Sequence, residues 1–194
     1  MAERLRGKTV AIVVADGFEQ IEMTEPRQAL EAEGAETYLV SPEKDEVRGW
    51  KHSEWGDTFL IDVPIHEAKP EQFDALLLPG GVMNPDKLRV DQDALNFIRS
   101  FFDAGKPVAA ICHAPWLLID VGVAKDRRLT SWPSIRSDLR NAGAIVVDEE
   151  VVVDAGLVTS RKPDDIPAFN RKMIEEFAEG EHAPRAAVVT QPSL

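Results

Sequence analysis

Short apolar runs alternate with amphipathic segments along the chain. Residues 9–15 (TVAIVVA) form an almost continuous β-branched run, which is typical of a central parallel strand covered on both faces. The apolar positions of residues 21–33 have helical spacing, Gly34 is placed to end that helix, and residues 37–40 follow as a second strand. This strand, helix and strand order predicts a crossover between two parallel strands.

The alternation continues to the C-terminal part of the chain. Short strands are predicted at residues 47–50, 59–63, 75–78, 129–130, 145–147, 151–153 and 157–159, and helices at residues 91–104, 135–141 and 164–177. We therefore expect an α/β sandwich, with ligands bound at the carboxyl ends of the parallel strands.

Local signals refine three of these elements. Gly105 is placed to stop the helix at 91–104, and residues 154–156 (DAG) have the composition of a hairpin turn. Asp164 is the expected N-cap of the last helix, with Asp165 in its first turn.

Aromatic and histidine side chains gather in the less regular segment between residues 41 and 70. Their spacing matches no metal-ligand pattern, so we expect no metal site and assign four of them to surface and edge packing: Trp50, His52, Trp55 and His66.

Length and composition limit the possible classes of protein. No linker divides the 194 residues, so we expect one domain over residues 1–180 and a flexible tail over residues 181–194. The net charge of -12 opposes binding to nucleic acid. With one cysteine, no signal peptide and no run as long as a membrane span, the expected location is the cytoplasm.

The single cysteine, Cys112, lies in the run 108–118 (VAAICHAPWLL), where a buried strand is expected to turn into a helix. Hydrolases expose a nucleophile above a sheet in such a strand, turn and helix. Amides at the helix start favour a thiolate. The alternative is a small core residue, because free cysteines are often buried.

The carboxyl ends of three parallel strands bring residues 16–20, 79–83 and 111–114 to one edge of the sheet. Glu19 is therefore expected to face Cys112, and the amides of Gly81 and His113 are candidates for an oxyanion hole. A charged carboxylate opposes thiolate formation, whereas a protonated one favours it. The alternative for Glu19 is a solvated loop carboxylate, and adjacent residues such as Cys112 and His113 often point apart.

Four motifs together identify a family resemblance: residues 16–19 (DGFE), 74–81 (DALLLPGG), 110–115 (AICHAP) and 159–165 (TSRKPDD). They resemble the PfpI family, which shares a superfamily of amidotransferase-like folds with the parkinsonism-associated deglycase. The resemblance implies a three-layer α/β sandwich with a mostly parallel, flavodoxin-like sheet and a nucleophile elbow at Cys112.

The same resemblance implies roles for individual residues. Cys112 is the expected nucleophile, Glu19 the carboxylate that hydrogen-bonds to it, and His113 the general base. Asp86 is expected to complete the triad from a neighbouring subunit, which implies a homodimer or larger assembly.

The resemblance also implies a substrate-binding and oxyanion region formed by Gly80, Gly81 and Ala114. The family commonly has glycine where Ala114 stands, so its methyl group is expected to narrow the pocket. Neither a metal nor a cofactor is implied. Glutamine amidotransfer is not expected, because the downstream catalytic histidine of those relatives has no counterpart before the tail.

Three functional hypotheses remain open at this stage. The first is a stress-protective cysteine-dependent enzyme, either a deglycase or glyoxalase that acts on dicarbonyl compounds and glycation adducts, or an intracellular cysteine peptidase. Both activities need a reactive thiolate and a nearby acid or base. The second is a non-enzymatic redox sensor or chaperone-like stress protein that uses oxidation of Cys112. The third is a retained fold without activity.

Overall fold

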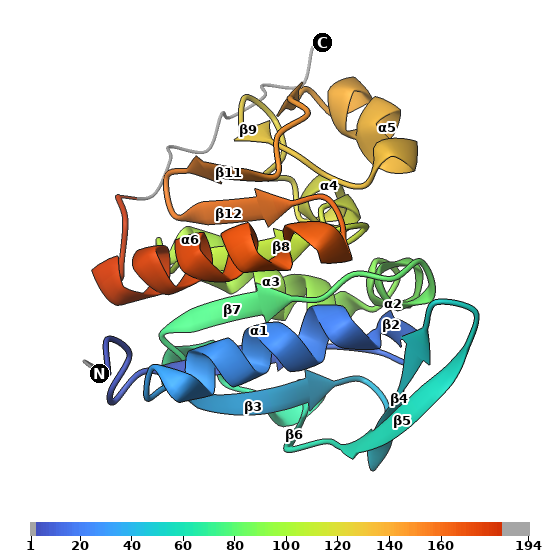
Figure 1. The fold of residues 1–194 in the computed structure, drawn as a ribbon, viewed down its shortest axis with the longest axis vertical. Coiled ribbons are helices and arrows are strands. Elements are labelled where there is room, and N and C mark those ends of the chain that lie inside the picture. The colour runs from blue at the N-terminus through green and yellow to red at the C-terminus, as the bar shows by residue number, and fades with distance from the viewer. Residues whose placement is uncertain (1–2, 184–194) are drawn as a thin grey trace, which may run out of the picture.

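A seven-stranded sheet forms the middle layer of the protein, in the order β11-β12-β8-β7-β1-β3-β6 (Figure 1). The computed structural model describes residues 3–183. All neighbouring strands in this sheet are parallel except β11 and β12. The strands are β1 (Thr9–Val13), β3 (Glu36–Ser41), β6 (Val63–Pro64), β7 (Ala75–Leu78), β8 (Val108–Ile111), β11 (Val151–Asp154) and β12 (Leu157–Ser160).

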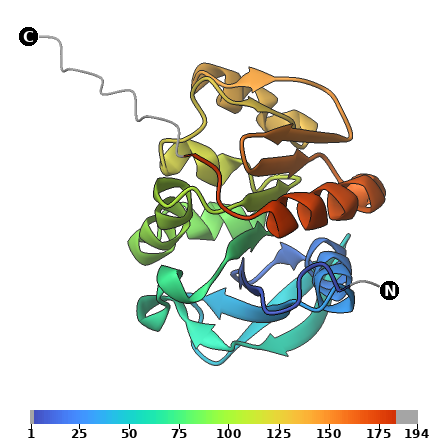
Figure 2. The same ribbon diagram turned by 90° about the vertical axis from the view of Figure 1, so that its left-hand side faces the viewer.

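Helices cover both faces of this sheet, as Figure 2 shows from the side. The residues of β1 alternate between the faces: Val10 and Ile12 pack with α1 (Gln20–Ala32) and α6 (Ile166–Glu179). Ala11 and Val13 pack with α3 (Gln92–Asp103) and α4 (Trp116–Asp120). The five central parallel strands lie side by side in the order β3, β1, β7, β8 and β12. Counted along the chain, these are the second, first, third, fourth and fifth of the five. The predicted three-layer, flavodoxin-like α/β fold is therefore confirmed.

A smaller sheet lies beside the carboxyl end of β1. It consists of β2 (Phe18–Glu19), β4 (Glu46–Lys51) and β5 (Glu54–Leu60), with β2 and β4 parallel and β4 and β5 antiparallel. The β4–β5 hairpin extends away from the main sheet in Figure 1. The remaining elements are β9 (Arg128–Leu129), β10 (Ile145–Val146), α2 (Met83–Leu88), α5 (Arg136–Asn141) and four 3₁₀ turns at Ile65–Glu67, Pro70–Gln72, Pro133–Ile135 and Pro163–Asp165.

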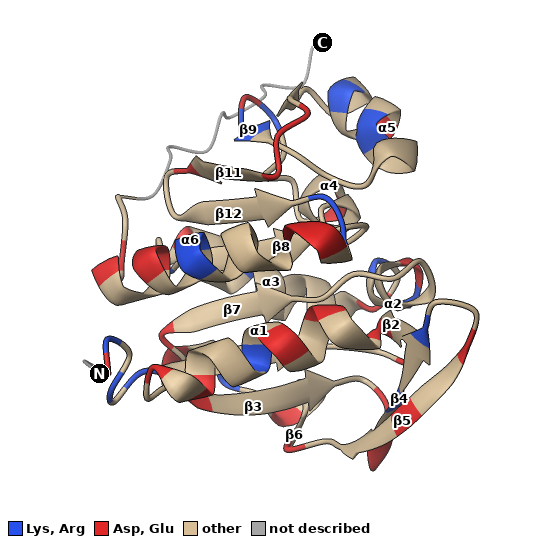
Figure 3. Ribbon diagram, viewed as in Figure 1, with Lys and Arg blue, Asp and Glu red and all other residues tan. Residues whose placement is uncertain are grey.

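The charged residues lie along the helices, turns and hairpin, whereas β7, β8 and β12 carry none (Figure 3). Buried strands of this kind need apolar side chains on both faces. None of the helices within residues 3–183 is long and apolar enough to cross a bilayer.

One expectation near the C-terminus is wrong. The last helix begins at Ile166, and Asp164 does not cap it but pairs with Lys162 at 2.9 Å, because a 3₁₀ turn precedes the helix. At the start of the predicted tail, the amide of His182 donates to the carbonyl of Gly105 at 2.8 Å. Residues 184–194 of that predicted tail lie outside the described residues.

Candidate active site

Cys112 lies in the tight turn between β8 and α4. Its backbone has a φ of 65°, a left-handed conformation that is unusual for a residue other than glycine and costs about 1–3 kcal/mol. The turn is held from both sides: the amide of Cys112 donates to the carbonyl of Ser160 at 3.0 Å, and its carbonyl accepts from the amide of Trp132 at 2.9 Å. The cysteine is only 5% exposed and lines a pocket.

This pocket has a volume of about 310 Å³ and opens at the carboxyl ends of β1, β7 and β8. That is the crevice where flavodoxin-like sheets bind their ligands, since the strand order reverses at β1. The β4–β5 hairpin contributes part of the wall. The lining residues are Gly17, Glu19, Glu22, Trp50, His52, Gly81, Val82, Met83, Cys112, His113, Trp132 and Pro163.

The carboxyl group that contacts Cys112 belongs to Glu22, which corrects the expectation for Glu19. Glu22 lies in the first turn of α1, is 0% exposed, hydrogen-bonds to Cys112 and accepts the Gly80 amide at 3.1 Å. Burial raises the pKa of Glu22 to about 8. The carboxyl is therefore mostly protonated at neutral pH.

Glu19 lies one helical turn earlier, at the end of β2, and also lines the pocket. Its carboxylate is 3.9 Å from Nδ1 of His52. Burial raises the pKa of Glu19, and His52 acts in the opposite direction. The sequence signal that distinguishes the two glutamates is that Glu22 falls inside the predicted helix, four and eight residues before the buried Pro26 and Leu30 and so on the same helix face.

Backbone amides surround the sulfur atom. The amides of Gly81 and His113 both hydrogen-bond to the Cys112 side chain. Burial and the neighbouring Glu22 raise the pKa of the Cys112 thiol, while these amides lower it. Because Cys112 and Glu22 hydrogen-bond to each other, the two groups titrate as one coupled unit.

The glycine pair makes this close approach possible. A Cβ atom on Gly80 would lie 2.5 Å from Oε2 of Glu22 and 2.6 Å from Cβ of Cys112. Gly81 has a φ of 82°, which favours glycine. Neither position has room for a larger residue without displacing the site.

His113 points toward Cys112 rather than away from it. Its Nδ1 is 3.2 Å from Sγ, its Nε2 is 3.3 Å from Oγ of Ser134, and its ring stacks on Trp132. Burial lowers the pKa of His113 to about 4, so the ring is neutral at pH 7. The tautomer with hydrogen on Nε2 donates to Ser134 and leaves Nδ1 free to accept the thiol proton.

Asp86 is an exposed residue in the first turn of α2. Within one chain the side chain next to Nε2 of His113 is Ser134, so the triad shared with a neighbouring subunit stays a prediction. Ala114 is fully buried in the core against α3 and α4, and its amide donates to the carbonyl of Ile111 at 3.0 Å. The expectation that Ala114 narrows the pocket is wrong.

Two residues of the β4–β5 hairpin, Trp50 and His52, line the pocket although the sequence assigned them to surface and edge packing. Trp50 is placed there by the pairing of β2 with β4, which sets Glu19 opposite Trp50. Its Nε1 donates to the carbonyl of His52 at 2.8 Å. No local sequence pattern predicts this pairing, because it joins segments about thirty residues apart.

Comparisons with known proteins show which family and fold this chain resembles. The family model described as DJ-1/PfpI family matches residues 8–176. An uncharacterized protein of Staphylococcus epidermidis is 46% identical over 172 residues, which cover 88% of this chain and 98% of that protein. The crystal structure of Drosophila melanogaster DJ-1beta has a TM-score of 0.80 and 29% identity, with 92% of this chain and 91% of that chain covered.

A two-domain protein of Anabaena variabilis, with DJ-1/ThiJ/PfpI-like and ferritin-like domains, is also similar in structure. It has a TM-score of 0.81 and 33% identity, and the match covers 87% of this chain and 47% of that one. The chain therefore spans about half of that protein.

Proposed function

This chain belongs to the DJ-1/PfpI family, and on that basis we propose that it is a cysteine-dependent enzyme acting on small dicarbonyl compounds or on their adducts with proteins. One observation carries the proposal. The Cys112 sulfur lies at a pocket wall in contact with a neutral histidine, a buried glutamic acid and two backbone amides. These groups supply a base, an acid and hydrogen-bond donors at one sulfur atom.

The size of the pocket favours a small substrate. A volume of about 310 Å³ is at the lower end of the range for ligand sites and holds a compact molecule better than an extended peptide. Trp50, Met83 and Trp132 give the pocket largely apolar walls. We therefore favour dicarbonyl or glycation chemistry over peptide hydrolysis.

The first step follows from the positions of the side chains. Nδ1 of His113 takes the thiol proton as Sγ of Cys112 attacks an aldehyde carbon. The carbon–sulfur bond forms, and the electron pair of the carbonyl π bond moves to the oxygen. That oxygen then takes the proton back from His113, which gives a thiohemiacetal. The amides of Gly81 and His113 are the candidate donors to the developing oxyanion.

Glu22 contributes in its protonated form. A protonated carboxyl donates a hydrogen bond to a thiolate and adds no negative charge, so it favours the reactive form of the cysteine. The raised pKa of Glu22, about 8, keeps most of the population in that form at neutral pH.

A second candidate function, redox sensing, is supported by the same cluster of donors. The two amides and the protonated Glu22 are also suited to hydrogen-bond the oxygen atoms of a sulfinic acid on Cys112. Mass spectrometry after graded peroxide tests this function: a Cys112 that stays reduced while exposed methionines oxidise would exclude it.

Self-association is part of the proposal, because the resemblance implies that Asp86 of a neighbouring subunit completes the triad at His113. The helix that carries Asp86, α2, is flanked by two exposed apolar residues, Val82 at 55% and Val90 at 83% exposure. Contact with a second copy over this helix would remove the apolar surface of these two valines from water. Analytical ultracentrifugation of the purified chain measures the assembly directly.

The enzymatic proposal is tested with methylglyoxal and the Cys112→Ser variant in a Tris-free buffer. The assay follows formation of a 2-hydroxy acid, because disappearance of methylglyoxal alone also reports simple trapping by thiols. The Glu25→Gln variant, an exposed change on the same helix as Glu22, is the matched control. Turnover that is the same in the Cys112→Ser variant and the unmodified protein would refute the proposal.

A further inference from the structure

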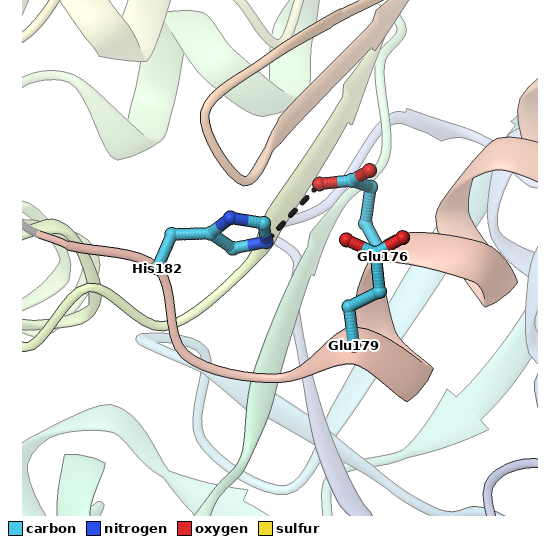
Figure 4. Close-up of side chains that lie close together, drawn as sticks. All are labelled: Glu176, Glu179 and His182. Atoms are coloured by element: carbon cyan, nitrogen blue, oxygen red, sulfur yellow. Dashed lines mark ion pairs between the residues drawn. The ribbon is translucent and has the colours of Figure 1, made fainter.

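A second cluster of ligand-type side chains lies at the C-terminal end of α6. Glu176 and Glu179 are one turn apart on the helix, and His182 follows on the segment beyond it (Figure 4). One ligand atom from each of the three residues lies within 4.8 Å of the others. The chain turns back toward the helix at Gly180, which has a φ of 85° and so brings His182 beside Glu176.

The two inner atoms of this cluster are buried and form an ion pair with each other that lacks hydrogen-bond geometry. Glu176 is 8% exposed, and neither its Oε2 nor Nε2 of His182 makes a hydrogen bond with suitable geometry. These atoms nevertheless point at each other across 3.2 Å. A buried polar atom without a hydrogen bond costs about 1–3 kcal/mol, and one cation bound by both atoms would satisfy them together.

The separation of 3.2 Å has the size expected for two ligands of one metal ion. Zinc binds histidine nitrogen and carboxylate oxygen at about 2.0–2.2 Å, and two such ligands at a tetrahedral angle lie roughly 3.3 Å apart. The local charge also suits a cation, because the end of α6 carries three glutamates at positions 175, 176 and 179. The nearby lysine, Lys172, pairs with Glu175.

The position of His182 is fixed by its surroundings. Its amide donates to the carbonyl of Gly105, and its ring packs over Gly156, where an added Cβ would lie 2.8 Å from the ring. Gly105 precedes β8, and Gly156 lies in the β11–β12 turn. The cluster is therefore at the opposite end of β8 from Cys112 and is independent of the function proposed above.

We propose that Glu176, Glu179 and His182 bind a first-row divalent transition metal such as Zn²⁺. The ion joins the end of α6 to the segment that runs over Gly105 and Gly156. Three protein ligands leave a fourth position for water. Imidazole among the ligands favours zinc, cobalt or nickel over magnesium and calcium. This site could not be predicted from the sequence, because His182 was expected in a flexible tail.

The test measures binding of Co²⁺ and Zn²⁺ to the full chain. Every protein tested carries Cys112→Ser, so that the thiol cannot bind the metal. Titration calorimetry with Zn²⁺ gives the affinity and stoichiometry, and the visible spectrum of Co²⁺ reports four-coordinate nitrogen and oxygen ligation. We expect one ion per chain, with affinity at least tenfold weaker in His182→Gln and in Glu176→Gln.

Two histidine variants serve as controls. His66→Gln removes an exposed histidine that lies 3.6 Å from a glutamate, and His52→Gln removes the histidine of the Cys112 pocket. Both should leave the affinity unchanged, and urea midpoints should show that every variant is folded. Absence of binding at one ion per chain, or a loss of affinity in His52→Gln with none in His182→Gln, overturns the proposal. The cluster is then an ordinary histidine–glutamate ion pair.

Discussion

Replacement of the buried Glu22 by glutamine should change how the stability of the protein depends on pH. Glutamine has the same shape, and its side-chain oxygen can still accept the Gly80 amide that Oε2 accepts at 3.1 Å. What it removes is a carboxyl group that burial keeps protonated in the folded state and that ionises freely in the unfolded state.

The magnitude follows from the pKa values. The carboxyl of Glu22 has an ordinary pKa of 4.5 and a folded pKa of about 8. A folded pKa above the unfolded one contributes stability that is fully present below pH 4.5 and is lost as the pH rises through 8. At about 1.4 kcal/mol per pH unit this amounts to roughly 5 kcal/mol in total, of which roughly 3 kcal/mol falls between pH 5 and pH 8.

The measurement is the free energy of unfolding in urea at pH 5, 6, 7 and 8. The free energy of unfolding of Glu22→Gln, minus that of the unmodified protein, should rise by roughly 3 kcal/mol from the lowest to the highest pH. The difference between the two proteins isolates Glu22 from the many other acidic groups. Glu25→Gln makes the same change in formal charge on the exposed side of α1 and should give a nearly flat difference. Parallel curves for Glu22→Gln and the unmodified protein would refute the assignment of a buried, protonated carboxyl.

Three further predictions concern the same pocket. Gly80→Ala places a methyl group against Glu22 and should destabilise the fold by about 1–3 kcal/mol in urea, whereas an unchanged midpoint would mean that the contact relaxes freely. Because burial lowers the pKa of His113 to about 4, its NMR ring signals should show no titration between pH 5.5 and 8, and a midpoint near 6.5 would contradict this. If a neighbouring copy completes the triad, Asp86→Asn should lower turnover by about tenfold or more without a change in thermal stability. Unchanged turnover would mean that Ser134, and not Asp86, orients the His113 ring.

The fold could be predicted because its main signals are local. The continuous apolar runs of β1, β7 and β8 indicate strands buried on both faces, and Gly34 and Gly105 end their helices in the left-handed conformation. Parallel strands then have to meet with their carboxyl ends at one edge of the sheet. That rule is enough to predict that Cys112 and the glycine pair lie close together.

The site was predicted less well because its details depend on rotation and register. Glu19 and Glu22 are separated by one helical turn and both line the pocket, so a small error in the predicted start of α1 exchanges the carboxyl beside His52 for the one beside Cys112. Trp50 and His52 reach the pocket through a strand pairing that no short window of sequence contains. The prediction for Ala114 was wrong for a different reason. Its position in the motif suggested a pocket residue, but the turn after Cys112 directs its side chain into the core.

The reactivity of Cys112 depends on the exclusion of water from the pocket. Burial alone raises the pKa of both the thiol and Glu22, which works against the thiolate. The same burial keeps Glu22 protonated, and a protonated donor together with two amides is what a desolvated thiolate requires. Burial therefore both opposes the thiolate and keeps protonated the carboxyl that stabilises it. Partial access of water would lower the pKa of Glu22, ionise it and place a negative charge beside the sulfur. The β4–β5 hairpin carries Trp50 and His52 to the pocket wall, so in the proposed mechanism its position would determine how much water reaches Glu22 and Cys112.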